Sequence, residues 1–263
     1  MLNFLRAENC LICNLSAGNN FFRQSELLRL GVLENRNTNP HLSFLMRHTC
    51  KDCLSKLPLL FPENTWSFEQ SNLEIRALFA YKEPINQLLL SYKFYHNLYL
   101  ANWFAEIMFL LWQKFWFDYK EQAVIVPIPL GKKRLRQRGF NQAAKIAELI
   151  AGFSEITFLP DFLIRQRETA RQTEMRNRTA RKTNLKDAFM INPELDCFAC
   201  KIKQENLTVI LFDDVTTTGI TLSEAAKPLL AKGLKVSATV VATEHQVKTR
   251  QQLESSTYGG DFV

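Results

Sequence analysis

The chain has 263 residues, of which 46% are hydrophobic and 22% charged, and this composition excludes a disordered or collagen-like protein. The length suits one large domain, or one ordinary domain with a small module. The charge is +7, and the basic excess is local, because residues 131–138 and 165–186 carry thirteen basic residues and two acids, whereas the other positions hold 20 basic residues and 24 acids. A local excess favours an anion-binding site over a surface coated for non-specific nucleic-acid binding.

Two segments bear on membrane targeting, the N-terminus and the longest apolar stretch. Arg6 interrupts the apolar start before a signal-peptide core can form, so no signal peptide is predicted. The longest apolar stretch is Leu98–Phe117, in which the polar residues Asn102, Glu106 and Gln113 fall on one helical face. This pattern favours an amphipathic, mostly buried helix over a transmembrane segment. We therefore expect a cytoplasmic protein.

The six cysteines form three Cys-x-x-Cys pairs. A disulfide framework is the weaker interpretation, because the cytosol keeps thiols reduced. Two such pairs can supply the four thiolates of a tetrahedral zinc site. We predict a structural Zn²⁺ site in an N-terminal module over residues 1–60. Its predicted ligands are Cys10, Cys13, Cys50 and Cys53.

Residues 14–49, between the first two pairs, form a long insert for a compact zinc ribbon. The insert is rich in asparagine and contains a short predicted helix at 27–33. His41 and His48 are alternative metal ligands or ordinary loop histidines.

The third pair, Cys197 and Cys200, precedes the main apolar strand of the C-terminal half. It can join the metal site, form a second site with a partner chain, or be incidental. We favour the incidental interpretation, and a thioredoxin-like redox role is disfavoured because no strand precedes either pair and opens into a helix.

Strand and helix patterns alternate along the middle of the chain. We expect strands at Ile75–Tyr81 and Ala123–Leu130, and helices at Pro84–Tyr95, 98–117 and Ala143–Ala151. This alternation is typical of an α/β fold with a mainly parallel sheet.

Two basic segments accompany these elements. Residues 131–142 are predicted to form a cationic loop, which either supplies the counter-charge for pyrophosphate or is a solvated basic turn. Residues 164–189 are too long for a tight turn and suit a solvated helix or a mobile lid that orders over a polyanion. Few aromatic residues lie near these segments in sequence (Phe140, Phe162 and Phe189), so no base-stacking platform is predicted.

The most informative segment is Leu207–Leu222. Val209–Phe212 is a continuous apolar run, as expected of a strand buried on both faces of a parallel sheet. The acids Asp213 and Asp214 follow, and a Thr/Gly loop opens into a predicted helix, Ser223–Lys232. Ligands of open α/β sheets bind at the carboxyl ends of strands, and hydroxyls with free N–H groups at a helix start bind phosphate.

The paired carboxylates can accept hydrogen bonds from a vicinal diol, or hold a metal beside the phosphate. Together with the hydroxyl-rich loop they indicate a ribose 5-phosphate site. There is no Gly-Lys-Ser/Thr ending and no Gly-x-Gly-x-x-Gly, which excludes a Walker A loop and a Rossmann dinucleotide fingerprint. The alternative is an ordinary strand-to-helix turn with a fortuitous Asp-Asp.

This segment resembles the signature of type I phosphoribosyltransferases for phosphoribosyl pyrophosphate (PRPP). The resemblance implies that Asp213 and Asp214 contact the ribose hydroxyls. It also implies a 5-phosphate cradle made by Thr217, Thr218, Gly219, Ile220 and Thr221. Thr216 departs from the family, which usually has an aliphatic residue there, and we expect altered packing at that position without loss of the site.

A longer set of blocks resembles the ComF/GntX family of competence-associated, phosphoribosyltransferase-like proteins, from Cys10 to about Thr243. The matching stretches are Phe79-Ala80-Tyr81, Tyr92-Lys93-Phe94, Pro127-Ile128-Pro129-Leu130, Arg138-Gly139-Phe140-Asn141-Gln142, Arg167-Glu168-Thr169, Gln172, Arg181 and Asn184. The long insert and the extra Cys-x-x-Cys pair depart from the family pattern.

The resemblance implies a type I phosphoribosyltransferase-like core over residues 61–263, with PRPP and Mg²⁺ as ligands. It implies a role in natural transformation, with incoming single-stranded DNA and a DNA-uptake helicase as partners. The residues implied in the pyrophosphate loop and lid are Lys132, Lys133, Arg134, Arg138, Asn141, Gln142, Arg167, Thr169, Gln172, Arg181 and Asn184.

Two functions follow from these implications. The favoured one is a DNA-uptake protein that retains a PRPP-type site. The alternative is an active phosphoribosyltransferase in nucleobase or nucleotide salvage. No catalytic base is assigned, because the acceptor in this chemistry can supply its own nucleophile.

Overall fold

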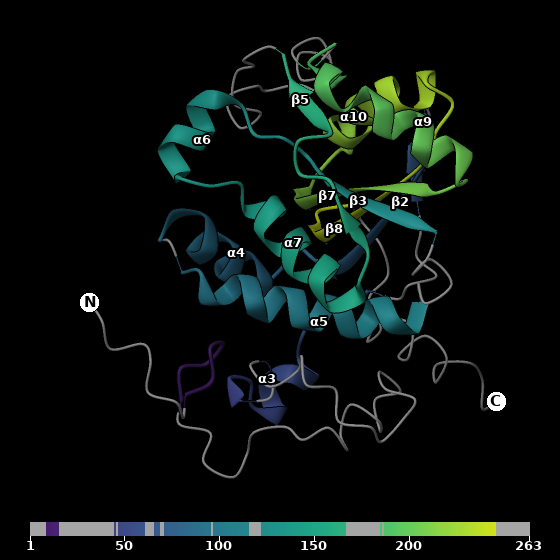
Figure 1. Ribbon diagram of the computed structural model, residues 1–263. Helices are drawn as coiled ribbons and strands as arrows, with labels where there is room; N and C mark the ends of the chain where they lie inside the picture. Colours follow the sequence, from purple (N-terminus) through teal and green to yellow (C-terminus); the bar gives the residue numbers. More distant parts are fainter. Residues whose placement is uncertain are drawn as a thin grey trace, which may run out of the picture.

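The computed structural model describes residues 9–15, 45, 47–60, 66–68, 71–95, 97–115, 122–166, 185 and 187–245, and for 66–68, 71, 72 and 111–115 it describes the backbone alone. A six-stranded sheet lies at the centre of the molecule, with helices packed on both of its faces (Figure 1). This is the α/β architecture with a mainly parallel sheet that the sequence predicts.

The sheet has the strand order β1-β2-β8-β7-β3-β4. The strands are β1 (Trp66–Phe68), β2 (Ser71–Ala80), β3 (Ala123–Pro127), β4 (Thr157–Phe158), β7 (Thr208–Thr216) and β8 (Lys235–Thr243). β1 pairs antiparallel with β2, and every other pairing is parallel. The carboxyl ends of β2, β8, β7 and β3 therefore meet at one edge, where ligands of such sheets bind.

Period-two alternation along the central strands sorts their side chains into two cores. Ile210 and Phe212 of β7 pack with α4 (Ile85–Phe94), α5 (Tyr99–Phe115) and α7 (Gln142–Ser154). Val209 and Leu211 pack on the opposite face with α9 (Asp196–Gln204) and α10 (Ile220–Ala231). Burial on both faces explains the continuous apolar run in this strand.

Five shorter elements complete the described fold. They are α3 (Lys51–Ser55), α6 (Lys132–Arg138), the 3₁₀ helix η5 (Pro193–Leu195), and a separate antiparallel pair of β5 (Leu163–Arg165) with β6 (Phe189–Ile191). The strands β5 and β6 bracket the second basic segment, and the Gln166 N–H donates to the Ala188 carbonyl at 3.0 Å where that segment leaves and returns. The predicted helix at 27–33 lies outside the described residues.

Two predicted boundaries are corrected. The apolar strand does not end before the acids, because β7 continues through Asp213 and Asp214 to Thr216. Residues 132–138 form the helix α6 and not a loop, since Lys, Arg, Leu and Gln are good helix formers and Gly139 ends the helix at a φ of +78°.

The apolar segment near residue 100 forms α5, which packs in the core. Trp103 is fully buried and its Nε1–H donates to Thr49 Oγ1 at 2.8 Å, while the buried Glu106 carboxylate accepts the Leu45 N–H at 2.6 Å. Within the described residues, no helix combines the length and apolarity that crossing a membrane requires. Both hydrogen bonds tie the cysteine-bearing segment to α5, and the domain division at residue 60 stays a prediction.

Candidate functional site

The turn from β7 into α10 is held by a side chain at the end of the strand. Gly219 has a φ of +67°, a left-handed conformation that favours glycine, and its N–H donates to Thr216 Oγ1 at 3.1 Å. The Ser223 N–H donates to the Gly219 carbonyl at 2.9 Å and starts the helix. The buried Thr216 hydroxyl therefore shapes the turn by a hydrogen bond, which an aliphatic residue cannot form.

The two acids lie near the end of β7 and make different contacts. Asp214 Oδ1 forms an ion pair with Lys93 Nζ at 2.9 Å, and both side chains are largely buried. The Asp214 N–H donates to Asp213 Oδ1 at 2.8 Å. The pair thus has one carboxylate neutralised by a lysine and one supported by a backbone amide.

Burial is the main electrostatic influence on this pair. Burial, and secondarily the neighbouring Asp214 charge, raise the pKa of Asp213 to about 7, although the Asp214 N–H, Lys93 and Arg138 oppose the shift. Burial and then Asp214 also raise the pKa of the Tyr92 hydroxyl, which donates to the Gln142 carbonyl at 3.1 Å. Burial and the neighbouring charge therefore favour the protonated form of Asp213 over the carboxylate.

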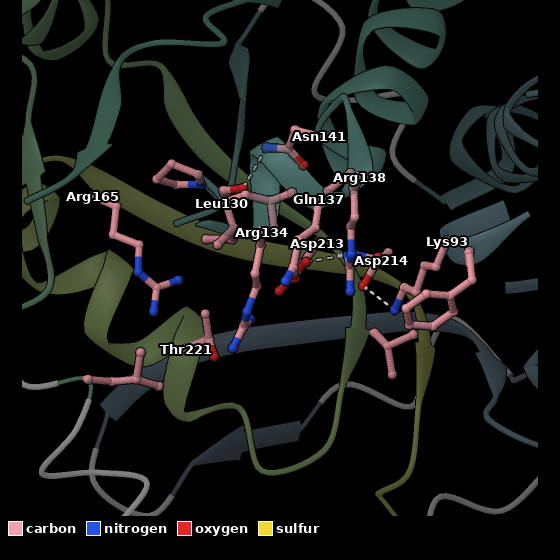
Figure 2. A pocket seen from close by; sticks show the side chains of 16 residues that line it. Lys93, Leu130, Arg134, Gln137, Arg138, Asn141, Arg165, Asp213, Asp214 and Thr221 are labelled. Atoms are coloured by element: carbon pink, nitrogen blue, oxygen red, sulfur yellow. Dashed lines mark hydrogen bonds and ion pairs between the residues drawn. The ribbon is translucent and has the colours of Figure 1, made fainter. Parts of the chain in front are cut away.

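A cavity of about 450 Å³ opens beside these acids at the carboxyl edge of the sheet. Figure 2 shows Arg134 and Arg138 extending toward the same space as Asp213 and Asp214, while Lys93 reaches Asp214. The polar residues that line it are Lys93, Arg134, Gln137, Arg138, Asn141, Arg165, Asp213, Asp214 and Thr221. Cations and carboxylates therefore share one pocket, as a ligand with both phosphate and hydroxyl groups requires.

The start of α7 positions the cationic side of this pocket. The Asn141 side chain caps the helix by accepting the Ala144 N–H at 3.3 Å, and its Nδ2 donates to the Ile128 carbonyl at 2.9 Å. Arg138 donates to Gln142 Oε1 at 3.0 Å. The buried Gln142 thus orients Arg138 from behind the pocket wall.

The structure brings some of the predicted site residues together and leaves others apart. The residues that line the cavity are Asp213, Asp214, Thr221, Arg134, Arg138 and Asn141. Thr217, Thr218, Gly219 and Ile220 form the adjacent turn and the start of α10 without lining the cavity. Lys132 and Lys133 are exposed on α6 and outside the cavity lining. Arg167, Thr169, Gln172, Arg181 and Asn184 lie outside the described residues.

The N-terminal cysteines form a second cluster. The sulfur atoms of Cys10, Cys13, Cys50 and Cys53 all lie within 4.8 Å of one another, and Cys13 Sγ and Cys50 Sγ are 3.9 Å apart. The Cys50 N–H donates to Cys10 Sγ at 3.4 Å. Four thiols at this spacing can bind a metal ion.

The chain is similar to curated competence proteins. It is 27% identical to "Competence protein F" of Haemophilus influenzae over 196 residues, which are 74% of this chain and 77% of that protein. It is 29% identical to "Competence protein ComFC" of Bacillus subtilis, over 62% of this chain and 61% of that protein. These similarities support the resemblance to the ComF family that the sequence blocks indicate.

Two further comparisons concern a DNA utilization protein and models of protein families. It is 32% identical to "DNA utilization protein YhgH" of Escherichia coli, over 41% of the chain and 44% of that protein. No protein-family model matches the chain.

The cysteine cluster fits the geometry of a four-thiolate site. Sulfurs at about 2.3 Å from a tetrahedral ion lie about 3.8 Å apart, close to the observed Cys13–Cys50 separation of 3.9 Å. Burial would raise the pKa of the Cys10 thiol, but N–H groups of Cys13, Cys50 and Ile12 and the Cys13 side chain lower it overall. Amide donors at a sulfur favour the thiolate that metal binding requires.

The other predicted metal ligands lie outside that cluster or outside the described part of the chain. Cys197 and Cys200 are exposed on α9 and do not belong to the group. His48 contributes its carbonyl, which accepts the Leu11 N–H at 2.9 Å, and it is not part of the group either. His41 is outside the described residues.

Four further residues line the cavity that the sequence patterns did not assign to the site. They are Lys93, Phe94, Gln137 and Arg165. Lys93 appeared only as part of a family block. The sequence signal for Lys93 is a single cation near the end of the apolar helix α4. This helix follows β2, whose carboxyl end lies at the same sheet edge as the acids.

Proposed function

We propose that this protein acts in DNA uptake, binds PRPP or a related ribose phosphate with Mg²⁺ in the cavity at the end of β7, and handles incoming single-stranded DNA. The names of its relatives, competence protein and DNA utilization protein, support the biological role. The convergence of an acid pair, the Thr221 hydroxyl and two arginines on one cavity is the observation that carries the ligand assignment.

The ribose end of the ligand would lie against β7 and α10. Ribose hydroxyls are donors and suit Asp213 and Asp214 as acceptors. The 5-phosphate would occupy the turn from Thr217 to Thr221, at the N-terminus of the twelve-residue helix α10, where the helix dipole favours an anion. Thr221 lines the cavity and would contribute its hydroxyl.

The pyrophosphate end would lie toward α6. Arg134 and Arg138 line the cavity and offer bidentate donors to phosphate oxygens. Lys132 and Lys133, exposed on the same helix, add positive potential at the entrance. Mg²⁺ would neutralise charge on the pyrophosphate, and Asp213 and Asp214 are the cavity carboxylates that would hold it. We assign the lid role to Arg167, Thr169, Gln172, Arg181 and Asn184.

A second candidate is phosphoribosyl transfer to a nucleobase or nucleotide in salvage. In that reaction the bond from C1 of the ribose to the pyrophosphate oxygen breaks, and a bond from C1 to an acceptor nitrogen forms. Arg134 and Arg138 would stabilise the departing pyrophosphate. The pKa of Asp213, raised by burial to about 7, favours this candidate because such a group can take up an acceptor proton near neutral pH.

Calorimetric titration with PRPP, with and without Mg²⁺, tests the proposal. The expected result is saturable, Mg²⁺-dependent binding that Asp213→Asn/Asp214→Asn abolishes. Asp196→Asn is the matched control, because Asp196 is an exposed carboxylate on α9 that pairs with Lys232 away from the cavity. No binding by the folded protein would overturn the ligand assignment, and pyrophosphate release on adding an acceptor base would establish transfer.

A further inference from the structure

The turn between α4 and α5 exposes an unusual concentration of large apolar side chains. Of the eight exposed large hydrophobic side chains in the described residues, five come from residues 90–99. We call this surface the aromatic ledge, and it consists of Leu90, Phe94, Tyr95, Leu98 and Tyr99. Tyr95 is 80% exposed and Phe94 is 56% exposed. Several large apolar side chains exposed within ten residues mark a binding site more often than scattered single ones do.

Helix α6 adjoins the ledge and is strongly cationic. Its seven residues include five cations and no acid, and none of its side chains is buried. Figure 1 shows α6 at the edge of the molecule, above α4. The Arg138 guanidinium lies 5.5 Å from the centre of the Phe94 ring, so the two surfaces are in contact.

The charge pattern of both segments selects an anionic occupant. The chain contains no acid between Glu83 and Glu106, which spans the ledge, and none between Glu121 and Glu148, which spans α6. A helix that carries five cations without acids is destabilised by mutual repulsion, and a bound polyanion relieves that cost. Lysine and arginine alone would suit any polyanion, so the aromatic rings must decide among them.

Exposed rings beside cations suit a single strand of nucleic acid better than the other polyanions. Unpaired bases have flat faces that stack on Tyr and Phe, whereas a duplex keeps its bases paired and stacked inside. An acidic protein segment would satisfy the cations but would leave the flat rings without matching planar partners. The sequence-based prediction of no stacking platform considered rings near the basic segments in the chain, whereas α4 and α5 supply these rings from a distant part of it.

We propose that the aromatic ledge and α6 together bind single-stranded nucleic acid, with bases stacked on Tyr95 and Phe94 and phosphates on the α6 cations. This proposal rests on the proposed function and locates its single-strand site. Phe94 and Arg138 also line the cavity. A strand on the ledge therefore passes the mouth of the ribose-phosphate pocket.

Fluorescence anisotropy with an end-labelled oligothymidylate of about 20 nucleotides tests this surface. Loss of one stacking ring is expected to weaken binding about tenfold in Tyr95→Ala, and Tyr95→Phe keeps the ring and should bind as the unmodified protein does. Leu230→Ala is the matched control, since Leu230 is an exposed apolar residue on α10. Lys132→Ser/Lys133→Ser should flatten the salt dependence, with a slope smaller by about 0.7 for each phosphate that the protein no longer neutralises.

The outcomes separate this surface from the cavity. Equal affinity of Tyr95→Ala and the unmodified protein would overturn the proposal, as would equal competition by a blunt duplex. Tyr95 does not line the cavity, so PRPP binding by Tyr95→Ala should be unchanged. If the unmodified protein bound oligothymidylate in a ring-dependent way but did not bind PRPP, the pocket assignment alone would fail.

Discussion

Lys93 Nζ lies 2.9 Å from Asp214 Oδ1, and this ion pair joins the end of α4 to β7 inside the cavity. The two residues are 121 positions apart in the chain, and their side chains are only 14% and 11% exposed. The lysine holds the Asp214 carboxylate in a fixed position through this ion pair. A ligand cation such as Mg²⁺, or the ribose hydroxyls, would meet an Asp214 carboxylate that is already oriented.

Lys93→Met is expected to destabilise the protein by about 2 kcal/mol, between the values for exposed and buried pairs, because it leaves Asp214 partly buried without its cation. Chemical denaturation measures this change. Lys145→Met is the matched control, since its pair with Glu148 is 47% and 53% exposed, and its loss should cost at most about 0.5 kcal/mol. Equal destabilisation by the two substitutions would contradict the role assigned to Lys93.

Asp213→Asn should change how stability depends on pH. Burial raises the pKa of Asp213 to about 7 in the folded state, against 3.8 as its ordinary value, so the folded state binds the proton more tightly than the unfolded state does. The Asp213 contribution to stability therefore falls as pH rises from about 4 to about 7, and it is constant above that range. Thermal denaturation at pH 5, 7 and 8.5 should show that Asp213→Asn is most stabilising at pH 8.5 relative to the unmodified protein. A stability difference independent of pH would contradict this linkage.

The same proton should appear in ligand binding. Diol hydroxyls donate to a carboxylate and not to its protonated form, so PRPP binding should strengthen as pH rises from 6 to 8. Titration calorimetry in buffers of different ionisation enthalpy should reveal proton release at pH 6.5 that disappears at pH 8.5. Proton uptake at pH 6.5 would show that Asp213 is protonated in the complex.

Thr216→Val should lower stability by about 1 kcal/mol, because the Gly219 N–H loses its acceptor in a buried turn. Thr216→Ser retains the hydroxyl and should restore most of the loss. Urea denaturation of the three proteins measures the difference, and PRPP titration reports whether the phosphate turn is altered. If Val and Ser behave alike, packing rather than the hydrogen bond governs this position.

Metal content should depend on the N-terminal cysteines alone. Elemental mass spectrometry is expected to find about one Zn²⁺ per chain, which Cys53→Ser should release. Cys197→Ser/Cys200→Ser should retain the ion, because these exposed cysteines on α9 lie outside the four-sulfur group. Removing the ion with a chelator should lower the melting temperature, since metal binding to the folded state alone stabilises it. Retention of zinc by Cys53→Ser would contradict the four-thiolate site.

Local patterns along the chain determined the α/β class and the position of the acid pair. A run of apolar residues specifies a strand buried on both faces, and glycine at 219 permits the left-handed turn that begins α10. Each Cys-x-x-Cys turn predicted one pair of neighbouring sulfurs, since its local geometry brings the two together. These features depend on neighbouring residues, which the sequence specifies directly.

Tertiary structure alone decided which distant residues complete the site. Lys93 joins Asp214, and Phe94 meets Arg138, only because the parallel sheet brings the segments that follow β2, β3 and β7 to one edge. The meeting of the aromatic ledge with α6 is a feature of the same kind. Contacts between segments far apart in the chain depend on how whole elements pack, and periodicity within one segment carries no information about its neighbours across the sheet.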